Sequence, residues 1–307
     1  MGTGDQEAAE ARALARRGVR DLLFAALVFS VMSVLAKRVG ARVPVGELIL
    51  VRSVMTLVLA RRALRARALP VWGTRRRLLA ARGALGFVAL ACYFYSITHL
   101  PIADAIVIHY THPVFTMLLA ALVLGEALQR REVVFIGGCF VGVVLVTRPA
   151  LVFGATTASR DPFALAVAFA GALISAAVYV LIRELRATEH PLRVVFYNAL
   201  VASALAAPWA LAEWVAPDAG EWALLLAIGL CTYVYQDRMT RGLHHVRAGR
   251  ATALGYVQVL ASMLAGIWLF SEEVDAVGWL GAGVLALGAA ALATEERGSA
   301  QRPSGSA

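Results

Sequence analysis

The sequence predicts an all-α integral membrane protein with ten transmembrane helices, arranged as two inverted five-helix repeats. Three observations lead to this fold class. The chain of 307 residues is 60% hydrophobic and only 16% charged, whereas soluble globular proteins carry about 25% charged residues. Its apolar residues form long stretches without charges, and its two halves resemble each other at a constant offset. This composition excludes an ordinary soluble enzyme and a disordered chain.

The charge-free stretches define the expected helices. A membrane-spanning helix needs about 20 largely apolar residues, and the shorter stretches reach this length once flanking charges snorkel to the interface. A further span, between Val43 and Leu59, is interrupted by Arg52. The charge-free stretches are residues 22–36, 83–103, 105–125, 133–147, 162–182, 194–212, 222–236, 251–271 and 276–294.

The basic residues predict the orientation. With the N-terminus placed in the cytoplasm, 22 of the 29 basic residues fall on the cytoplasmic side, 5 fall on the outer side, and Arg52 and Arg82 remain. Cytoplasmic loops of membrane proteins are enriched in Arg and Lys. We therefore expect an inner (cytoplasmic) membrane protein with both termini in the cytoplasm. The net charge of +9 then needs no nucleic-acid partner.

The two halves match at an offset of 146 residues, which pairs Tyr110 with Tyr256 and Glu126 with Glu272. Each half would hold five spans, and because five is odd, the second half crosses the membrane in the opposite sense. Inverted repeats are typical of secondary transporters, whose substrate site lies near the midplane between the repeats. The expected organisation is a cytoplasmic tail over 1–20, repeats over 21–149 and 161–294, an outer loop over 150–160, and a disordered cytoplasmic tail over 295–307.

Short motifs follow one another in the first half: Arg82-Gly83, Tyr93-Phe94-Tyr95-Ser96, Leu100-Pro101-Ile102-Ala103-Asp104-Ala105, Leu124-Gly125-Glu126 and Arg148-Pro149. Their order resembles the EamA-type branch of the drug/metabolite transporter superfamily. The resemblance implies ten helices, cytoplasmic termini, a central cavity and secondary transport of small metabolites or drugs. Such proteins often have a proline in the second repeat where this chain has Val259, opposite Pro113. We therefore expect span 251–271 to be straighter than span 105–125.

Arg52 is the clearest candidate for a functional charge. It lies close to the middle of its span, where placing a charge costs at least ~2.5–3.5 kcal/mol on insertion scales. It is either a counter-charge for an anionic substrate group or a structural arginine bonded to a neighbouring helix. Its equivalent in the second repeat is the neutral Asn198.

A polar face is predicted on two equivalent spans. His109, His112 and Thr116 share one helical face, and the offset places Gln258 and Ser262 on the equivalent span. We expect these faces to line the cavity, and either histidine could couple substrate to protons because histidine titrates near neutral pH. The alternative is hydrogen bonding between packed helices. Two histidines at this spacing lack further ligands, so we expect no metal and no cofactor.

Further candidates for substrate contact are aromatic and amide side chains within spans: Tyr179, Asn198, Tyr233 and Gln236. Each tyrosine is equally explained by ordinary helix packing. Tyr110 and Tyr256 lie about 160° around the helix from His112 and Gln258, and we expect them outside the lining. Glu126 and Glu272 end equivalent spans, as helix-end anchors or as latches of a gate.

The leading hypothesis is a secondary active transporter, an exporter of small metabolites, amino-acid-like compounds or drugs. The single lysine, Lys37, is not in a phosphate-binding loop motif, so we expect no ATP hydrolysis by this chain and no enzyme activity. A membrane-embedded enzyme and a channel are the alternatives. The expected partners are a small-molecule substrate and the lipid bilayer. The small-residue ridge Gly138-x-x-x-Gly142 either joins the two halves or supports a homodimer.

Overall fold

The computed structural model describes residues 3–40, 42–100, 102–153, 161–270 and 274–294. Glu272, the tail 295–307 and most of the expected outer loop lie outside the described residues. Every regular element in the described part is a helix: α1 (Thr3–Val39), α2 (Val45–Ala66), α3 (Arg76–His99), α4 (Ile102–His109), α5 (His112–Leu124), α6 (Arg130–Thr147), α7 (Ala150–Phe153), α8 (Pro162–Leu185), α9 (Pro191–Ala212), α10 (Ala219–His245), α11 (Ala248–Leu254), α12 (Val257–Phe270) and α13 (Ala276–Thr294).

These helices make ten spans in the described part of the chain, because α4 continues into α5 and α11 into α12, while α7 has only four residues. Seven spans are long and apolar enough to cross a membrane by length and composition. The other three are α2, α6 and α10, which carry more charged residues. The fold is therefore the expected all-helical bundle of two five-span halves.

Local sequence explains where several helices begin and end. Asp161 caps α8, since its carboxylate accepts a hydrogen bond from the Phe163 amide at 2.9 Å. Asp218 and Glu221 form a reciprocal capping box at the start of α10. Gly125 ends α5 in the left-handed conformation, at φ 65°, which glycine adopts without steric cost.

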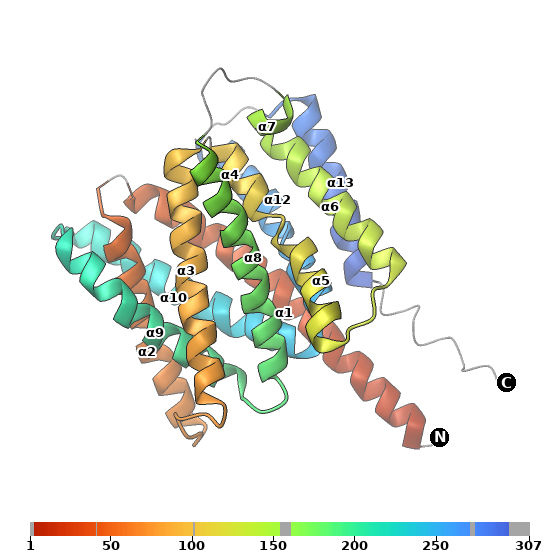
Figure 1. Cartoon of the computed structure of the whole chain (residues 1–307). Coiled ribbons are helices and arrows are strands. Elements are labelled where there is room, and N and C mark those ends of the chain that lie inside the picture. The colour runs from red at the N-terminus through yellow and green to blue at the C-terminus, as the bar shows by residue number, and fades with distance from the viewer. Residues whose placement is uncertain (1–2, 41, 101, 154–160, 271–273, 295–307) are drawn as a thin grey trace.

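The packing follows the repeat. Helix α1 packs on α10 while its equivalent, α8, packs on α3, the equivalent of α10. In two further cases, a helix packs directly on its own equivalent in the other repeat: α2 packs on α9, and α6 packs on α13. Figure 1 shows the red α1 running behind the bundle and α6 lying beside α13. The two repeats are thus exchanged by an approximate two-fold axis through the bundle.

The connections between spans lie at two ends of the bundle. The arginine-rich end holds the connections from α2 to α3, α5 to α6, α8 to α9 and α10 to α11. The opposite end holds the connections from α1 to α2 and α9 to α10. Consecutive spans cross in opposite senses, so these connections alternate between the two ends.

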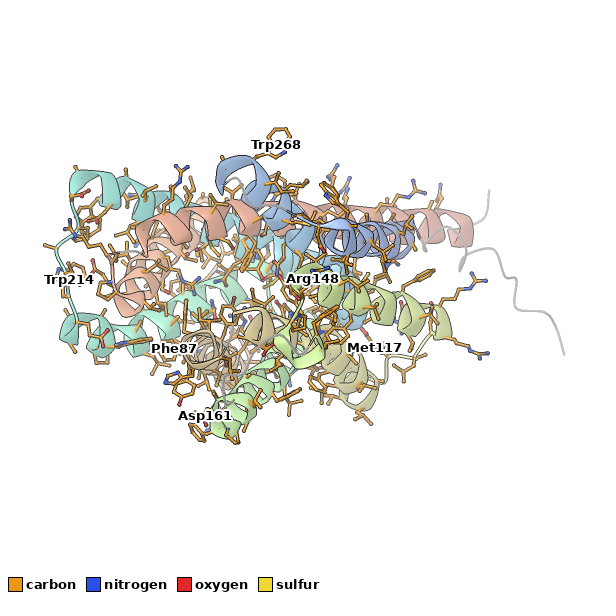
Figure 2. All side chains as sticks on the ribbon, turned by 90° about the horizontal axis from the view of Figure 1, so that it is seen from above. Phe87, Met117, Arg148, Asp161, Trp214 and Trp268 are labelled. Atoms are coloured by element: carbon orange, nitrogen blue, oxygen red, sulfur yellow. The ribbon has the colours of Figure 1, made fainter. Side chains whose placement is uncertain are left out.

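The outer surface is apolar, as a lipid-facing surface should be. Trp268 is 84% exposed and points away from the bundle in Figure 2. Small residues lie inside instead. A Cβ atom on Gly142 would meet the Gly281 carbonyl oxygen at 2.9 Å. Gly142 therefore lets α6 pack closely on α13 of the second half, whereas a Cβ atom on Gly138 would meet nothing within 4 Å.

Both spans of the polar face are broken, which corrects the expectation that 251–271 is the straighter one. Helix α4 stops at His109, and α11 stops at Leu254, one residue short of the equivalent position. In the second break, several amides bond three residues back, as in a 3₁₀ turn: Gly255 to Thr252, Tyr256 to Ala253 and Gln258 to Gly255. This break needs no proline. The Tyr256 hydroxyl instead donates across the repeat axis to the Tyr110 carbonyl oxygen at 2.8 Å.

Candidate functional site

A cavity of about 220 Å³ lies where the two helix breaks meet the neighbouring spans. Its walls come from both repeats, and most of the wall positions are equivalent under the offset of 146 residues. The equivalent pairs in the lining are Phe29 with Ser175, Met32 with Val178, Arg52 with Asn198, Gly86 with Thr232, Ala89 with Tyr235, Leu90 with Gln236, and Tyr93 with Met239. The cavity therefore sits on the pseudo-two-fold axis.

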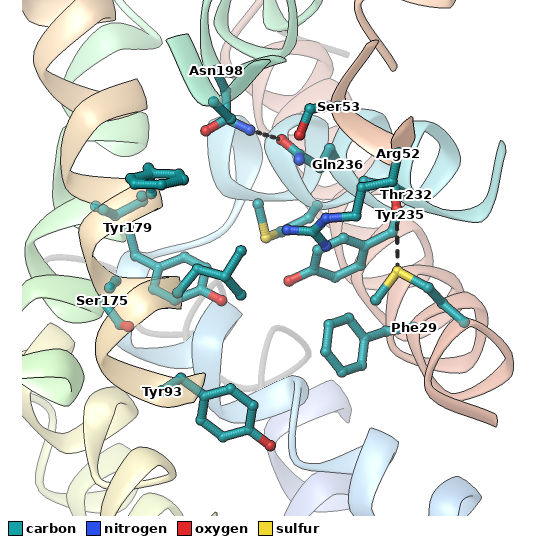
Figure 3. A pocket seen from close by; sticks show the side chains of 18 of the residues that line it. Phe29, Arg52, Ser53, Tyr93, Ser175, Tyr179, Asn198, Thr232, Tyr235 and Gln236 are labelled. Carbon is teal, nitrogen blue, oxygen red and sulfur yellow. Dashed lines mark hydrogen bonds between the residues drawn. The ribbon is translucent and has the colours of Figure 1, made fainter. Parts of the chain in front are cut away.

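Six of the predicted substrate-contact residues line this cavity: Arg52, His109, Tyr179, Asn198, Gln236 and Gln258. Figure 3 shows the Arg52 side chain entering from one side, with Tyr179 and Tyr93 on the other. The structure thus brings residues from α2, α4, α8, α9, α10 and α12 to one place.

Hydrogen bonds fix the polar part of the wall. Asn198 Nδ2 donates to Gln236 Oε1 at 2.8 Å, which joins α9 to α10 (Figure 3). Thr232 donates to the Met32 sulfur at 3.2 Å, which joins α10 to α1. These bonds hold the side chains of different spans in fixed positions.

The histidines form a ring cluster beside the cavity. The rings of His109 and His112 lie 5.2 Å apart, and His112 stacks on Tyr179 at 5.1 Å. His112 lies in the wall of a smaller adjoining cavity of about 40 Å³, together with Tyr179 and Gln258. Its Nδ1 atom is buried and has no hydrogen-bond partner in the described part of the chain.

Three predicted residues lie outside both cavities. Thr116 is fully buried and donates to the His112 carbonyl oxygen at 2.7 Å. Tyr233 packs against the hydrophobic core. Ser262 is exposed on the outer surface. Helix α12 packs mainly on α1 and α13. Gln258, at the start of α12, still lines the cavity, but Ser262, one turn further along, does not.

The expectation that Tyr110 lies outside the lining is wrong. The expectation assumed a continuous helix with a regular angle between successive residues, but the helix is broken at residues 110–111. Tyr110 lines both cavities. The Gln258 amide donates to the Tyr110 hydroxyl. Tyr256 is fully buried and, as expected, is not among the residues that line either cavity.

Sequence reasoning missed several lining residues, among them Arg82 and Tyr235. Arg82 marks the edge of a charge-free stretch and therefore reads as a helix end. The helix begins six residues earlier, at Arg76, among a run of arginines, so Arg82 is buried within it, at 4% exposure. The stretch 83–103 is long enough to span a membrane by itself, so helix length gave no signal that Arg82 lies inside.

Glu126 organises the arginine-rich end. Its carboxylate accepts from Arg183 Nε at 2.9 Å and from the Ala248 amide at 3.1 Å. Arg183 also donates to the carbonyl oxygens of Leu243 and His244, both at 3.0 Å. The carboxylate caps the N-terminus of α11 and the guanidinium caps the C-terminus of α10, which both suit the helix dipoles. One ion pair therefore connects α5 of the first repeat with α8, α10 and α11 of the second.

Two known transport proteins resemble this chain, one of them over nearly its full length. It is 31% identical to the pseudopaline exporter CntI of Pseudomonas aeruginosa over 287 residues, which cover 93% of this chain and 99% of that one. It is 27% identical to the S-adenosylmethionine uptake transporter of Rickettsia prowazekii over 63% of this chain and 64% of that one.

A solved crystal structure shares the fold with a TM-score of 0.77 at 19% identity, and covers 94% of this chain. The sequence profile of the EamA-like transporter family matches residues 17–148 and again residues 162–294, which are the two five-span halves. The chain is a membrane transporter, not an enzyme, and belongs to the EamA-like transporter family.

Proposed function

We propose that this protein is a secondary active transporter that exports small metabolites, amino-acid-like compounds or drugs across the cytoplasmic membrane by alternating access. The observation that carries the proposal is the cavity on the pseudo-two-fold axis, lined by equivalent positions of both repeats. Rocking of one repeat against the other around such a site exposes it to each side in turn.

The proposed direction of transport is based on the similarity of this chain to a known exporter. The exporter resemblance spans 99% of the relative's length, whereas the resemblance to the uptake transporter spans 64%. The excess of basic residues on one side supports cytoplasmic termini. In this orientation the arginine-rich end faces the cytoplasm.

The proposed substrate site consists of Arg52, Tyr179, Asn198, Gln236 and Gln258. Arg52 supplies a counter-charge, and the amides and the tyrosine hydroxyl supply hydrogen bonds. His109 and His112 are the proposed proton-coupling groups, because their rings adjoin the site and histidine changes charge near neutral pH.

The test is transport by the purified protein in liposomes and by inverted and right-side-out vesicles, with a panel of radiolabelled metabolites. We expect the wild type to move at least one of them outward with respect to the cell. Arg52→Ala and His112→Ala should reduce this transport at least tenfold, whereas Ser262→Ala, on the outer surface, should not. Transport that is unchanged in both site variants, with normal insertion, contradicts the site assignment.

A further inference from the structure

Two arginines of the cavity wall have no counter-charge. The Nε atoms of Arg52 and Arg82 are both buried without a hydrogen-bond partner, and neither guanidinium has an ion-pair or hydrogen-bond partner in the described part of the chain. Neither cavity has an aspartate or glutamate among its described lining residues. The site thus holds two positive charges and no negative one.

The two charges belong to one site. Arg52 comes from α2 and Arg82 from α3, and Tyr235 lies within electrostatic range of both guanidiniums. A Cβ atom on Gly86 would lie 3.2 Å from Asn198 Oδ1 and 3.6 Å from a terminal nitrogen of Arg82. Arg82 therefore reaches the same wall as the amide pair of Asn198 and Gln236.

Buried charges in proteins are almost always paired, since an isolated charge loses its hydration without compensation. Each of the two unpaired charges in this cavity wall carries this cost. A ligand that brings two negative charges offsets the cost at both guanidiniums. A cation gains nothing at this site, and a monoanion leaves one guanidinium unpaired, so the site also selects against those classes.

The other lining residues indicate what the uncharged part of the ligand is like. Phe29, Tyr93, Tyr179 and Tyr235 offer aromatic faces, the three tyrosines also offer hydroxyl groups, and Gln236 offers an amide. Aromatic faces contact apolar groups, while the hydroxyls and the amide bond polar substituents. This wall suits an organic molecule with an apolar part.

We propose that the substrate is an organic dianion, with one acidic group bound by Arg52 and a second bound by Arg82. Guanidinium groups bind carboxylates through paired, charge-assisted hydrogen bonds. This inference rests on the proposed transport function, of which it names the substrate class. Both arginines belong to the first repeat, and their equivalents, Asn198 and Ile228, are neutral, so the charge recognition is asymmetric although the cavity is not.

The test compares ligands of matched size and different charge. The probes are N-benzoyl-L-glutamate, a dianion, N-benzoyl-L-glutamine, a monoanion, and N-benzoyl-L-glutamine amide, which is neutral, with the corresponding acetyl and hexanoyl series. Binding is measured as thermal stabilisation of the purified protein, and transport is measured separately in liposomes. We expect wild-type protein to bind the dianions roughly ten- to a hundredfold more tightly than the monoanions.

Arg52→Gln and Arg82→Gln should each abolish this preference, so that dianion and monoanion bind alike. Arg61→Gln, an exposed change on the same helix as Arg52, should preserve it. A second measurement excludes a purely structural role. Because neither arginine loses a protein partner, neither glutamine variant should lower the melting temperature of the ligand-free protein, whereas removal of structural arginines would.

A wild type that binds no dianion of the panel, or binds monoanions or neutral probes equally well, overturns the inference and leaves the transport function standing if any probe is moved. The opposite result is dianion binding that depends on the two arginines, with no probe moved across the membrane. It supports the dianion site and contradicts the proposed function.

Discussion

The two ends of the bundle are held together in different ways. At the arginine-rich end, the Arg183–Glu126 pair joins the repeats with its side chains only 8% and 15% exposed. At the opposite end, the Arg42 side chain is 54% exposed and pairs with Asp218, which is 59% exposed, and with Glu221, which is 15% exposed. Arg148 pairs with Asp275, and both are largely exposed. Glu47 is buried there, but its described bond is to the Val215 backbone amide at 3.2 Å.

This difference indicates which end of the bundle costs more free energy to open. Exposed ion pairs contribute about 0–1 kcal/mol, whereas removal of one partner of a buried pair costs about 3–5 kcal/mol. The buried Arg183–Glu126 pair should therefore hold the arginine-rich end more firmly than the exposed pairs hold the opposite end. In the proposed orientation, the arginine-rich end is the cytoplasmic end.

The largest effect is expected for Glu126→Gln. The glutamine keeps the shape of the side chain but leaves the Arg183 guanidinium without its counter-charge, so conformations open at the arginine-rich end gain. A loss of roughly 3 kcal/mol would change the ratio of closed to open protein about a hundredfold. The measurement is the labelling rate of Met239→Cys by an impermeant maleimide in inverted vesicles, in a background without Cys92, Cys139 and Cys231.

The matched control acts at the opposite end. Arg42→Ala removes the pairs of the exposed Arg42 guanidinium with Asp218 and Glu221 and its bond to the Ala216 carbonyl oxygen. We expect it to leave the labelling of Met239→Cys within about twofold of the parent, since exposed pairs contribute little. Equal labelling in the Glu126→Gln and parent proteins would show that the buried pair does not hold the arginine-rich end closed.

A smaller effect is expected at Glu189, within the arginine-rich end. Its carboxylate accepts from the Arg75 backbone amide at 2.7 Å and from Arg193 at 3.2 Å, and it is buried. Glu189→Gln should cost about 1.5–3 kcal/mol, as for hydrogen bonds to charged groups, measured by unfolding in detergent. Glu184→Gln breaks an exposed pair with the same Arg75 and should cost less than about 1 kcal/mol. Equal costs for the two variants would mean that burial does not explain the strength of this end.

The smallest effect is a pH dependence at His190, at the same end. Its Nδ1 caps α9 by accepting from the Leu192 amide at 3.2 Å, which requires the neutral ring. Burial, and then the positive charges of Arg67, Arg241 and Arg193, hold its pKa below 6.5. Because the unfolded chain binds the proton more readily, stability is complete above pH 6.5 and falls as the pH drops through the lowered pKa.

The loss should not exceed the ~1 kcal/mol of a helix cap. His190→Asn keeps a capping side chain that does not titrate. Its melting temperature in detergent should therefore fall less than that of the wild type between pH 7.5 and 5. Parallel losses in the two proteins would place the pH dependence elsewhere.

Much of the fold was predictable because charges and apolar stretches report directly on the lipid environment. The break at residues 110–111 lies just before Pro113, and a proline removes a helical hydrogen bond, so the sequence indicated a less straight span there. The break at residues 255–256 was not predicted, because no proline marks it and the bond from Tyr256 to Tyr110 joins residues of different repeats. Tyr110 was misplaced because the expectation assumed a continuous helix at residues 110–111. Arg82 was missed because a charge at the edge of an apolar stretch looks the same whether the helix ends there or continues.

The two unpaired guanidiniums have a further consequence for a protein in an energised membrane. If a dianion neutralises them, the loaded transporter carries no net charge at its site, and the empty transporter carries two positive charges. An inside-negative membrane potential then pulls the empty site back toward the cytoplasm, by about 2.3 kcal/mol for each charge per 100 mV. Voltage would act on the return step rather than on the loaded step, and the membrane potential alone could drive the export of an anion.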